Sequence, residues 1–273
     1  MDPRRADVRG LWSCRCPSPR SRAGRVLARS FGQDVGVSTL RTTPRILPTH
    51  VGVVMDGNRR WARRAGLPSA SEGHRRGADH VEDLLGWCEA RAVDHLTIYV
   101  LSADNIRKRS SDEVGFLFEL IGEVLPGIVD RSNRWALHVS GDTSLLPPRV
   151  AEALARAERS TDGRDAHVTL AIAYDGRADI VAGVRAAILA GALDPATGLD
   201  PGAITDHLPG GPVKEIDLVI RTSGEQRLSG FVPWQAAHAE VHVSPKLWPD
   251  FDETDLDLAL AQYAARASAA GAA

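Results

Sequence analysis

Short runs of apolar residues alternate along the chain with longer segments in which apolar residues recur every three or four positions. The short runs are typical of buried strands, and the longer segments are typical of helices with one buried face. Strands are predicted over residues 51–55, 95–101, 135–140, 167–173, 216–220 and 240–243. Helices are predicted after residue 58 and over residues 73–91, 111–124, 147–159, 179–190, 203–208 and 253–266. This alternation predicts a single α/β domain with a mostly parallel central sheet and helices on both faces.

Polar residues follow four of the predicted strands at the point where each strand ends. They are Asp56, residues 102–105, residues 174–177 and residues 221–225. The carboxyl ends of parallel strands meet at one edge of a sheet, and ligands bind at that edge in this class of fold. The sequence has no G-x-G-x-x-G pattern, so a dinucleotide-dependent enzyme is not favoured.

The most concentrated candidate chemistry lies in residues 50–66. The polar residues that follow the predicted strand are Asp56, Gly57, Asn58, Arg59, Arg60, Arg63 and Arg64. Gly57 would let the backbone approach an anion closely, and the arginines add planar hydrogen-bond donors that suit phosphate. Asp56 is placed to hold a divalent cation that bridges to phosphate oxygens. The pattern indicates a diphosphate and metal site, with a capped helix and a solvated basic face as the alternative.

A second charged cluster follows the strand predicted over residues 216–220. Arg221, Arg227 and Ser229 lie among glycines and can form a cradle for another diphosphate. An ion-paired surface loop is the alternative. Glu240, further along the chain, either joins Asp56 as a metal ligand or caps a strand end.

Two histidines near the end of the chain resemble metal ligands at first sight. His238 and His242 are four residues apart on a predicted strand, which places them on one face but far from each other. No third ligand is evident, so a zinc site is not favoured.

Composition limits the function classes further. The chain has 273 residues, 33 basic and 35 acidic, and its formal net charge of −2 gives no support for binding to nucleic acid. No stretch approaches the roughly 18 apolar residues of a membrane span, which leaves peripheral association as the only membrane contact to consider. Three cysteines are too few for a disulfide framework and fit a reducing, cytoplasmic location.

Residues 1–45 differ in composition from the rest of the chain. Eight arginines fall in the first thirty positions, among serine, proline and glycine, and no apolar core of the signal-peptide type follows them. We expect this segment to be a disordered, Arg-rich extension, and a wrongly assigned upstream start codon and a transit peptide are the alternatives. Residues 46–271 are expected to form the catalytic domain.

Three motifs together resemble the cis-prenyltransferases, the Z-type isoprenyl diphosphate synthases. Residues 50–61 read HVGVVMDGNRRW and are similar to the family's H-x-x-x-x-M-D-G-N-x-R-W. Residues 217–229 read DLVIRTSGEQRLS and are similar to its D-L-x-I-R-T-x-G-E-x-R-x-S. Residues 247–251, LWPDF, match a late motif, and the resemblance extends from about residue 46 to residue 271.

The resemblance implies a role for each matching residue. Asp56 would hold Mg²⁺ on the diphosphate of the allylic substrate, and Glu240 would assist with the metal. The same resemblance places Asn105 and Ser102 beside the substrate, where they would help to remove a proton. The allylic diphosphate, of geranyl or farnesyl type, would be bound by Gly57, Asn58, Arg59, Arg60, Trp61 and His74. Isopentenyl diphosphate would be bound by Arg221, Arg227 and Ser229, with Glu225 shaping the loop.

Several departures from the family pattern bear on the product. The family's F-S-S-E-N-W is Leu-Ser-Ala-Asp-Asn-Ile at residues 101–106, and the arginine usual before Gly73-His74 is absent. Four features resemble a short-chain actinobacterial subgroup whose members make Z,E-farnesyl diphosphate: Asn-Arg-Arg-Trp at residues 58–61, a loop one residue longer before Gly73-His74, Leu-Ser-x-x-Asn at residues 101–105, and SGEQRLSGF at residues 223–231. Val100 occupies a position that is small in long-chain members, and a stiff β-branched side chain there would narrow the tunnel for the growing tail. The predicted product is therefore a short Z-prenyl diphosphate.

Other outcomes stay open from the sequence. A medium-chain or long-chain synthase, an irregular branching or cyclising enzyme, and a non-catalytic partner subunit are the alternatives. The family's C-terminal R-x-G element is reduced here to Ala269-Ala270-Gly271, with Arg266 kept. The resemblance implies a homodimer, with residues 231–243 as candidate interface elements.

Overall fold

The computed structural model describes residues 46–194 and 198–270. The Arg-rich extension expected over residues 1–45 lies outside the described residues. Among the residues described, no helix combines the length and the apolar character needed to cross a membrane.

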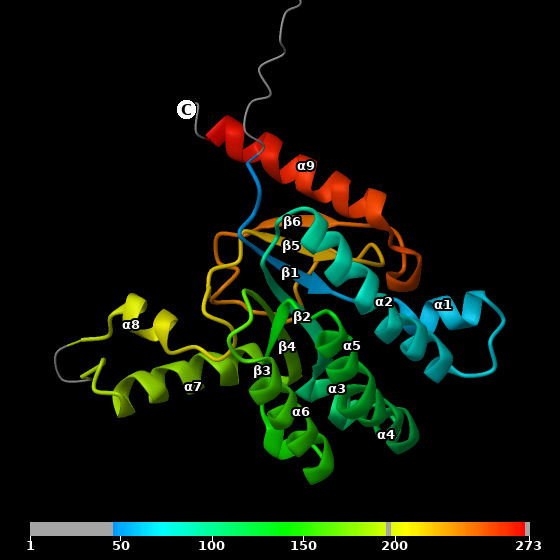
Figure 1. Ribbon diagram of the computed structural model, residues 1–273, viewed down its shortest axis with the longest axis horizontal. Coiled ribbons are helices and arrows are strands. Elements are labelled where there is room, and N and C mark those ends of the chain that lie inside the picture. Colours follow the sequence, from blue (N-terminus) through cyan, green and yellow to red (C-terminus); the bar gives the residue numbers. More distant parts are fainter. Residues whose placement is uncertain (1–45, 195–197, 271–273) are drawn as a thin grey trace, which may run out of the picture. The chain divides into compact units, whose positions relative to one another are not determined.

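One parallel sheet organises the described chain (Figure 1). Its strands are β1 (His50–Val54), β2 (His95–Ser102), β3 (Trp135–Ser140), β4 (Ala166–Tyr174), β5 (Leu218–Arg221) and β6 (Glu240–Val243). They lie in the order β3-β4-β2-β1-β5-β6, and each of these neighbouring pairs is parallel. The predicted parallel α/β fold is confirmed, and the carboxyl ends of all six strands lie at one edge.

Helices connect the strands. They are α1 (Asn58–Arg64), α2 (Ala70–Ala90), α3 (Ala103–Lys108), α4 (Ser111–Glu119), α5 (Leu125–Arg131), α6 (Pro148–Thr161), α7 (Gly176–Leu189), α8 (Pro201–Asp206) and α9 (Glu253–Ala270). A π-helical turn, Leu120–Val124, joins α4 to α5, where the sequence predicted one uninterrupted helix. Helix α3 was not predicted, because residues 102–105 read as a polar loop. The Ser102 hydroxyl begins α3 by accepting a hydrogen bond of 2.9 Å from the Asn105 backbone N–H.

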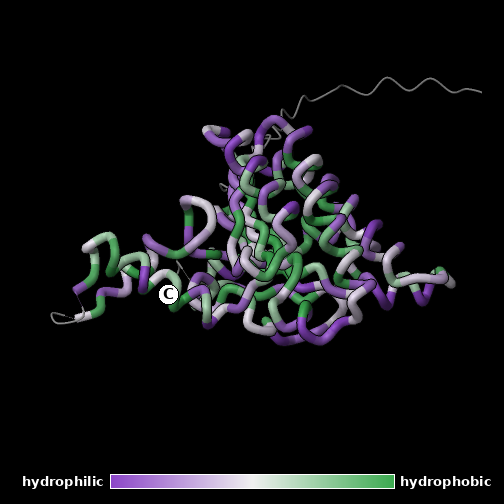
Figure 2. The backbone as a smooth tube through the Cα atoms, turned by 90° about the horizontal axis from the view of Figure 1, so that it is seen from below, coloured by the Kyte–Doolittle hydropathy of each residue, from purple (hydrophilic) through white to green (hydrophobic). Residues whose placement is uncertain are grey.

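The main hydrophobic core lies on one face of the sheet. Alternate strand residues such as Val53 and Ile98 pack there against the apolar faces of α2, α4, α5, α6 and α9. The helical residues come at the predicted spacing, as Val81, Leu84, Leu85 and Cys88 do on α2. Figure 2 shows the hydrophobic stretches of the chain passing through its interior.

The other face of the sheet has a smaller core. Phe231 and Val232, from the segment before β6, pack there with Val219 and Tyr174. Helix α7 is held to this face by Asp179, whose carboxylate accepts hydrogen bonds from the side chains of Ser140, Tyr174 and Gln235 at 2.9, 3.1 and 2.9 Å. Helices α7 and α8 share a third apolar cluster with Trp234.

Strand β2 departs from regular alternation at Val100. The pairing with β4 shifts between Tyr99 and Leu101, so a bulge falls at this residue. Tyr99 packs into the smaller core, whereas Leu101 joins Ile98 and Val100 in the main core. Regular strand alternation would place Leu101 opposite Val100, but the bulge turns both side chains to the same face.

Candidate active site

The loops that follow β1 and β5 are tied together at the carboxyl edge of the sheet. Because these strands are neighbours, Asp56 and Thr222 come side by side. The Thr222 hydroxyl lies 2.9 Å from the Asp56 backbone N–H, from which it accepts, and it donates to the Asp56 carbonyl oxygen at 2.7 Å. The position of the Asp56 backbone is therefore fixed from both sides.

Gly57 is required where the chain turns from β1 into α1. Its φ of +112° lies in the region that favours glycine, and a Cβ atom there would be 2.9 Å from the Leu247 side chain. The next residue, Asn58, has a buried side-chain oxygen, Oδ1, without a hydrogen-bond partner in the described chain. Gly77 on α2 lies next to this oxygen, and a Cβ atom added to Gly77 would be only 2.3 Å from it.

Asp56 is held by arginines from both loops. Arg221 donates from Nη2 to Asp56 Oδ2 at 3.1 Å and from Nη1 to the Ser229 hydroxyl at 3.0 Å. Arg60 places Nη2 3.8 Å from Asp56 Oδ1 and donates from the same nitrogen to the Ser223 hydroxyl at 2.5 Å. The two motifs identified in the sequence thus meet at one carboxylate.

A second charged group surrounds Glu113 on α4. Its carboxylate lies 3.0 Å from His74 Nε2, 3.0 Å from Arg109 Nη1 and 3.9 Å from Arg59 Nε. Burial is the main cause that lowers the pKa of both His74 and Arg109. The hydrogen bond that His74 donates to the Glu113 carboxylate raises the pKa of His74 by a smaller amount. Arg109 also keeps its buried Nε without a partner in the described chain.

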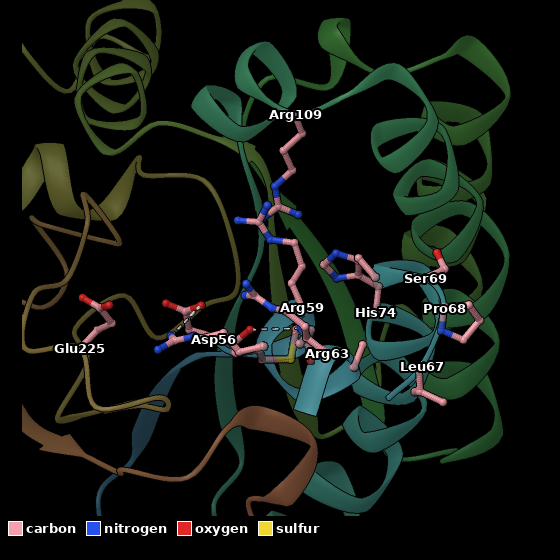
Figure 3. Close-up of a pocket in the computed structure, with 15 residues that line it drawn as sticks. Asp56, Arg59, Arg63, Leu67, Pro68, Ser69, His74, Arg109 and Glu225 are labelled. Carbon is pink, nitrogen blue, oxygen red and sulfur yellow. Dashed lines mark hydrogen bonds and ion pairs between the residues drawn. The ribbon is translucent and has the colours of Figure 1, made fainter. Parts of the chain in front are cut away.

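Several of these side chains, those of Asp56, Arg59, Arg60, His74 and Arg109, line one cavity of about 790 Å³ (Figure 3). In this view Arg59, Arg109 and His74 lie on one side of Asp56, and Glu225 lies on the other. The wall between α1 and α2 consists of the less polar residues Leu67, Pro68, Ser69 and Ala70. A cavity of this size with several cationic side chains can hold a diphosphate together with part of an apolar substrate.

The structure brings most of the predicted allylic-site residues together. Asp56, Gly57, Asn58, Arg59, Arg60 and His74 all line the cavity. Trp61 is the exception, since its indole N–H donates to Asp250 at 2.7 Å, and Trp61 is not among the lining residues. Its place in the structure indicates that it fixes α1, and its contact with the allylic diphosphate stays a prediction.

The predicted cradle for the second diphosphate is partly assembled. Arg221 and Ser229 are in contact, whereas the Arg227 side chain is 74% exposed and lies 3.3 Å from Glu225. Ser102 and Asn105 cap and form the first turn of α3, outside the lining of the cavity. Val100 is partly buried against the main core.

Glu240 does not reach Asp56 within one chain. It begins β6, where it is paired with Leu218 at the amino edge of the sheet, whereas Asp56 follows the carboxyl end of β1. Its carboxylate forms an ion pair with Arg266 on α9. Within a single chain Glu240 and Asp56 therefore lie at opposite edges of the sheet, and the role of Glu240 at the metal stays a prediction.

Sequence reasoning missed Arg109 and Glu113. Both lie beyond the quoted motifs, and Arg109 enters the cavity only because α3 turns the chain back after β2. One signal was available in the sequence. Arg109 lies four positions before Glu113, a spacing at which a basic and an acidic side chain can pair, and the cap residue Ser110 marks the start of the helix between them.

Comparison with known proteins agrees with this geometry. Residues 54–271 match the prenyltransferase family model described as undecaprenyl diphosphate synthase. The chain belongs to this family. It is therefore an enzyme of the cis-prenyltransferase type, as the sequence motifs implied.

Three members of the family illustrate the similarity. An isoprenyl transferase of Streptomyces fradiae is 41% identical over 83% of this chain and 91% of its own. A (2Z,6E)-farnesyl diphosphate synthase of Mycolicibacterium smegmatis is 40% identical over 81% of this chain and 86% of its own. The crystal structure of lavandulyl diphosphate synthase from Lavandula x intermedia, in complex with dimethylallyl diphosphate, has a TM-score of 0.73 and 35% identity. It covers 80% of this chain and 95% of that one.

Proposed function

We propose that this prenyltransferase condenses isopentenyl diphosphate with an allylic diphosphate to give a short Z-prenyl diphosphate, of which Z,E-farnesyl diphosphate is the foremost candidate. The observation that carries the proposal is the meeting of Asp56, Arg60 and Arg221 at one edge of the sheet. Relatives named for the same product are about 40% identical to this chain, which supports the choice of product.

The residues present fit a magnesium ion that is shared with substrate phosphates. Among the described residues no group of three or more His, Cys, Asp or Glu side chains could hold a metal by itself. Asp56 is a single carboxylate, 40% exposed, on the wall of a cavity that also contains several arginines. Mg²⁺ is commonly held by one or two carboxylates together with phosphate oxygens, and Asp56 can supply such a ligand.

The chain's own residues would stabilise the negative charge of the diphosphates and position the two substrates. In the reaction, the allylic carbon–oxygen bond to diphosphate breaks, and the isopentenyl double bond forms the new carbon–carbon bond. A proton is then lost. Arg59, Arg60 and Arg109 would hold the departing diphosphate, and Arg221, Arg227 and Ser229 would hold the isopentenyl diphosphate. Mg²⁺, when bound, would further stabilise negative charge on the leaving group. Ser102 and Asn105 remain the proposed residues for positioning substrate and removing the proton.

Branching or cyclising coupling is the second candidate. The similarity to the lavandulyl diphosphate synthase, whose crystal structure contains dimethylallyl diphosphate, makes that compound an allylic substrate to include in any assay.

The test is direct incubation of the purified full chain with Mg²⁺, isopentenyl diphosphate and, separately, dimethylallyl, geranyl or farnesyl diphosphate. Products are hydrolysed and identified by chromatography against linear, branched and cyclic standards. We expect a short linear Z-product, with geranyl diphosphate as the preferred allylic substrate. The matched control is Asp56→Asn, which we expect to remain folded and to lose about 10²-fold or more in turnover. Absence of any condensation product in the wild type would overturn the proposal.

A homodimer in the cytoplasm completes the proposal. Strand β6 lies at an edge of the sheet and exposes 38% of Val241, so part of the expected interface is available to a partner. Phe231 and Val232, in contrast, are buried in their own chain. Light scattering at micromolar concentration should give twice the chain mass, and cell fractionation should recover the activity without membranes.

A further inference from the structure

The ion pair between Asp56 and Arg221 joins the two diphosphate sites proposed above. Asp56 belongs to the allylic site, and Arg221 belongs to the isopentenyl site. The Arg221 side chain is only 5% exposed, and its ion pair with Asp56 has an N–O distance of 3.1 Å. A buried guanidinium requires a nearby negative charge, and Asp56 supplies it in the ligand-free chain.

Arg221 nevertheless retains capacity for another anion. Its Nη1 donates to the neutral Ser229 hydroxyl, and its buried Nε has no hydrogen-bond partner in the described chain. A diphosphate has several negative oxygens and can accept from more than one nitrogen of the same guanidinium. It is therefore a stronger partner for Arg221 than one carboxylate oxygen.

The ion pair also affects the carboxylate. Each oxygen of Asp56 faces a guanidinium, Oδ2 that of Arg221 and Oδ1 that of Arg60 at 3.8 Å. A divalent cation approaching Asp56 in this state meets two positive groups within a few ångströms, and they oppose its binding. If the Arg221 side chain moved from Asp56 to a bound diphosphate, Asp56 would have fewer positive neighbours and one carboxylate oxygen free to bind metal.

We propose that Arg221 keeps Asp56 from binding a divalent cation until a diphosphate occupies the isopentenyl site. This inference rests on the proposed function and adds a coupling between its two sites. The carboxylate that helps to activate the allylic leaving group becomes available only when the acceptor is bound. The arrangement limits loss of the allylic diphosphate to hydrolysis while isopentenyl diphosphate is absent.

The coupling is reciprocal, and this gives a test in the absence of metal. If Arg221 must leave Asp56 in order to bind a diphosphate, then neutralising Asp56 makes Arg221 available at once. We therefore expect Asp56→Asn to bind isopentenyl diphosphate about tenfold more tightly than the wild type in EDTA. Equilibrium dialysis of the full chain with labelled isopentenyl diphosphate, without allylic substrate, measures this affinity without turnover. The nearly isosteric change leaves the backbone contacts of Asp56 with Thr222 in place.

Asp112→Asn is the matched control. It also removes one negative charge, but Asp112 is exposed on α4 and accepts a hydrogen bond from Ser111, outside both diphosphate sites. We expect a clearly smaller gain in affinity for this variant. An unchanged or weaker affinity in Asp56→Asn would overturn the coupling, as would an equal gain in Asp112→Asn, which would indicate a general charge effect.

The metal side of the coupling is tested with Mn²⁺, followed by electron paramagnetic resonance of the free ion. Isopentenyl diphosphate should tighten Mn²⁺ binding to the wild type about tenfold. Arg221→Met should bind Mn²⁺ more tightly than the wild type without diphosphate, whereas Arg64→Met, on α1 beside Asp250, should behave as wild type. An Arg221→Met protein that binds Mn²⁺ like the wild type contradicts the proposal.

If the wild type condenses substrates yet shows none of these differences, only the coupling fails. If it binds no isopentenyl diphosphate even with Mg²⁺, the proposed function fails as well.

Discussion

The His74 imidazole lies 3.0 Å from the Glu113 carboxylate, and both side chains are largely withdrawn from solvent. The same carboxylate is the counter-charge of Arg109 and lies near Arg59, so one acidic residue of α4 organises three groups on the cavity wall. The proposed diphosphate binding by these groups would depend on their spacing, which Glu113 holds.

Glu113→Gln should therefore weaken both folding and catalysis. It leaves the partly buried Arg109 without its charged partner, which we expect to lower the free energy of unfolding by about 1–3 kcal/mol. We also expect kcat/KM for the allylic substrate to fall. Urea denaturation and steady-state kinetics measure the two effects. Asp112→Asn, an exposed neighbour on the same helix turn, should change stability by no more than about 0.5 kcal/mol.

Arg227 should act mainly on isopentenyl diphosphate. Because its side chain is 74% exposed and pairs with Glu225, it is free to close on a diphosphate. We expect Arg227→Ala to raise the KM for isopentenyl diphosphate more than the KM for the allylic substrate. Arg227→Lys should rescue this only in part, because lysine lacks the planar fork. A larger rise in the allylic KM would mean that the two diphosphate sites are exchanged.

Val100 is expected to limit product length. Its side chain packs into the main core at the β2 bulge, and cores resist added volume at a cost of about 1–3 kcal/mol. Val100→Ala should relieve part of that cost and shift the product mixture to longer chains, as measured by chromatography. Val181→Ala, at an exposed position on α7, is the control that should leave the distribution unchanged. An unchanged distribution in Val100→Ala would remove this residue from the role.

A row of histidines should make the fold sensitive to acid. His50, His95, His167 and His138 follow the strand order from β1 to β3, with ring centroids 6.1, 5.2 and 5.2 Å apart. Burial is the main cause that lowers all four pKa values, to about 4 for His50 and His138, and neighbouring imidazoles add to the effect for His50, His95 and His138. The folded state therefore binds fewer protons than the unfolded chain between pH 6.5 and 4.

The sign of this effect follows from linkage. Stability from the neutral row is fully present above pH 6.5 and is lost as the pH falls toward 4. For the buried His50, the loss is on the order of 3 kcal/mol. Denaturant midpoints at pH 7.5, 6 and 5 measure the slope. His50→Gln should flatten it, whereas His207→Gln, on the turn after α8 and outside the row, should not. Equal slopes in the wild type and His50→Gln would contradict the prediction.

The sequence predicted the fold, and the positions of Asp56 and Arg221 after their strands, because both depend on local patterns. Buried strands and amphipathic helices have readable periods, and Asp56 and Arg221 each follow a predicted strand. Their contact depends on β1 and β5 being neighbours, which no local pattern specifies. The position of Glu240 could not be predicted for a related reason, since it begins its strand and parallel pairing carries it to the opposite edge from Asp56.

The remaining differences arise from short irregular features. Arg109 enters the cavity through α3, a six-residue helix whose sequence reads as a loop. The bulge at Val100 changes the face of Leu101, and a run of apolar residues contains no signal for such a shift. Features of this size depend on tertiary packing more than on propensity.

The close approach of α1 to α2 exposes a conflict between thermal tolerance and catalysis. Gly77 and Gly86 both lie inside α2, where replacing glycine with alanine usually stabilises a helix by about 1 kcal/mol. At Gly86 nothing lies within 4 Å of the added carbon, so Gly86→Ala should raise the melting temperature at no cost to turnover. At Gly77 the same carbon would fall 2.3 Å from Asn58 Oδ1 and displace the turn that carries Asp56. Selection for heat resistance can therefore replace Gly86 near one end of α2. Near the other end, Gly77 must remain glycine, a weak helix former, because the turn that carries Asp56 packs against it.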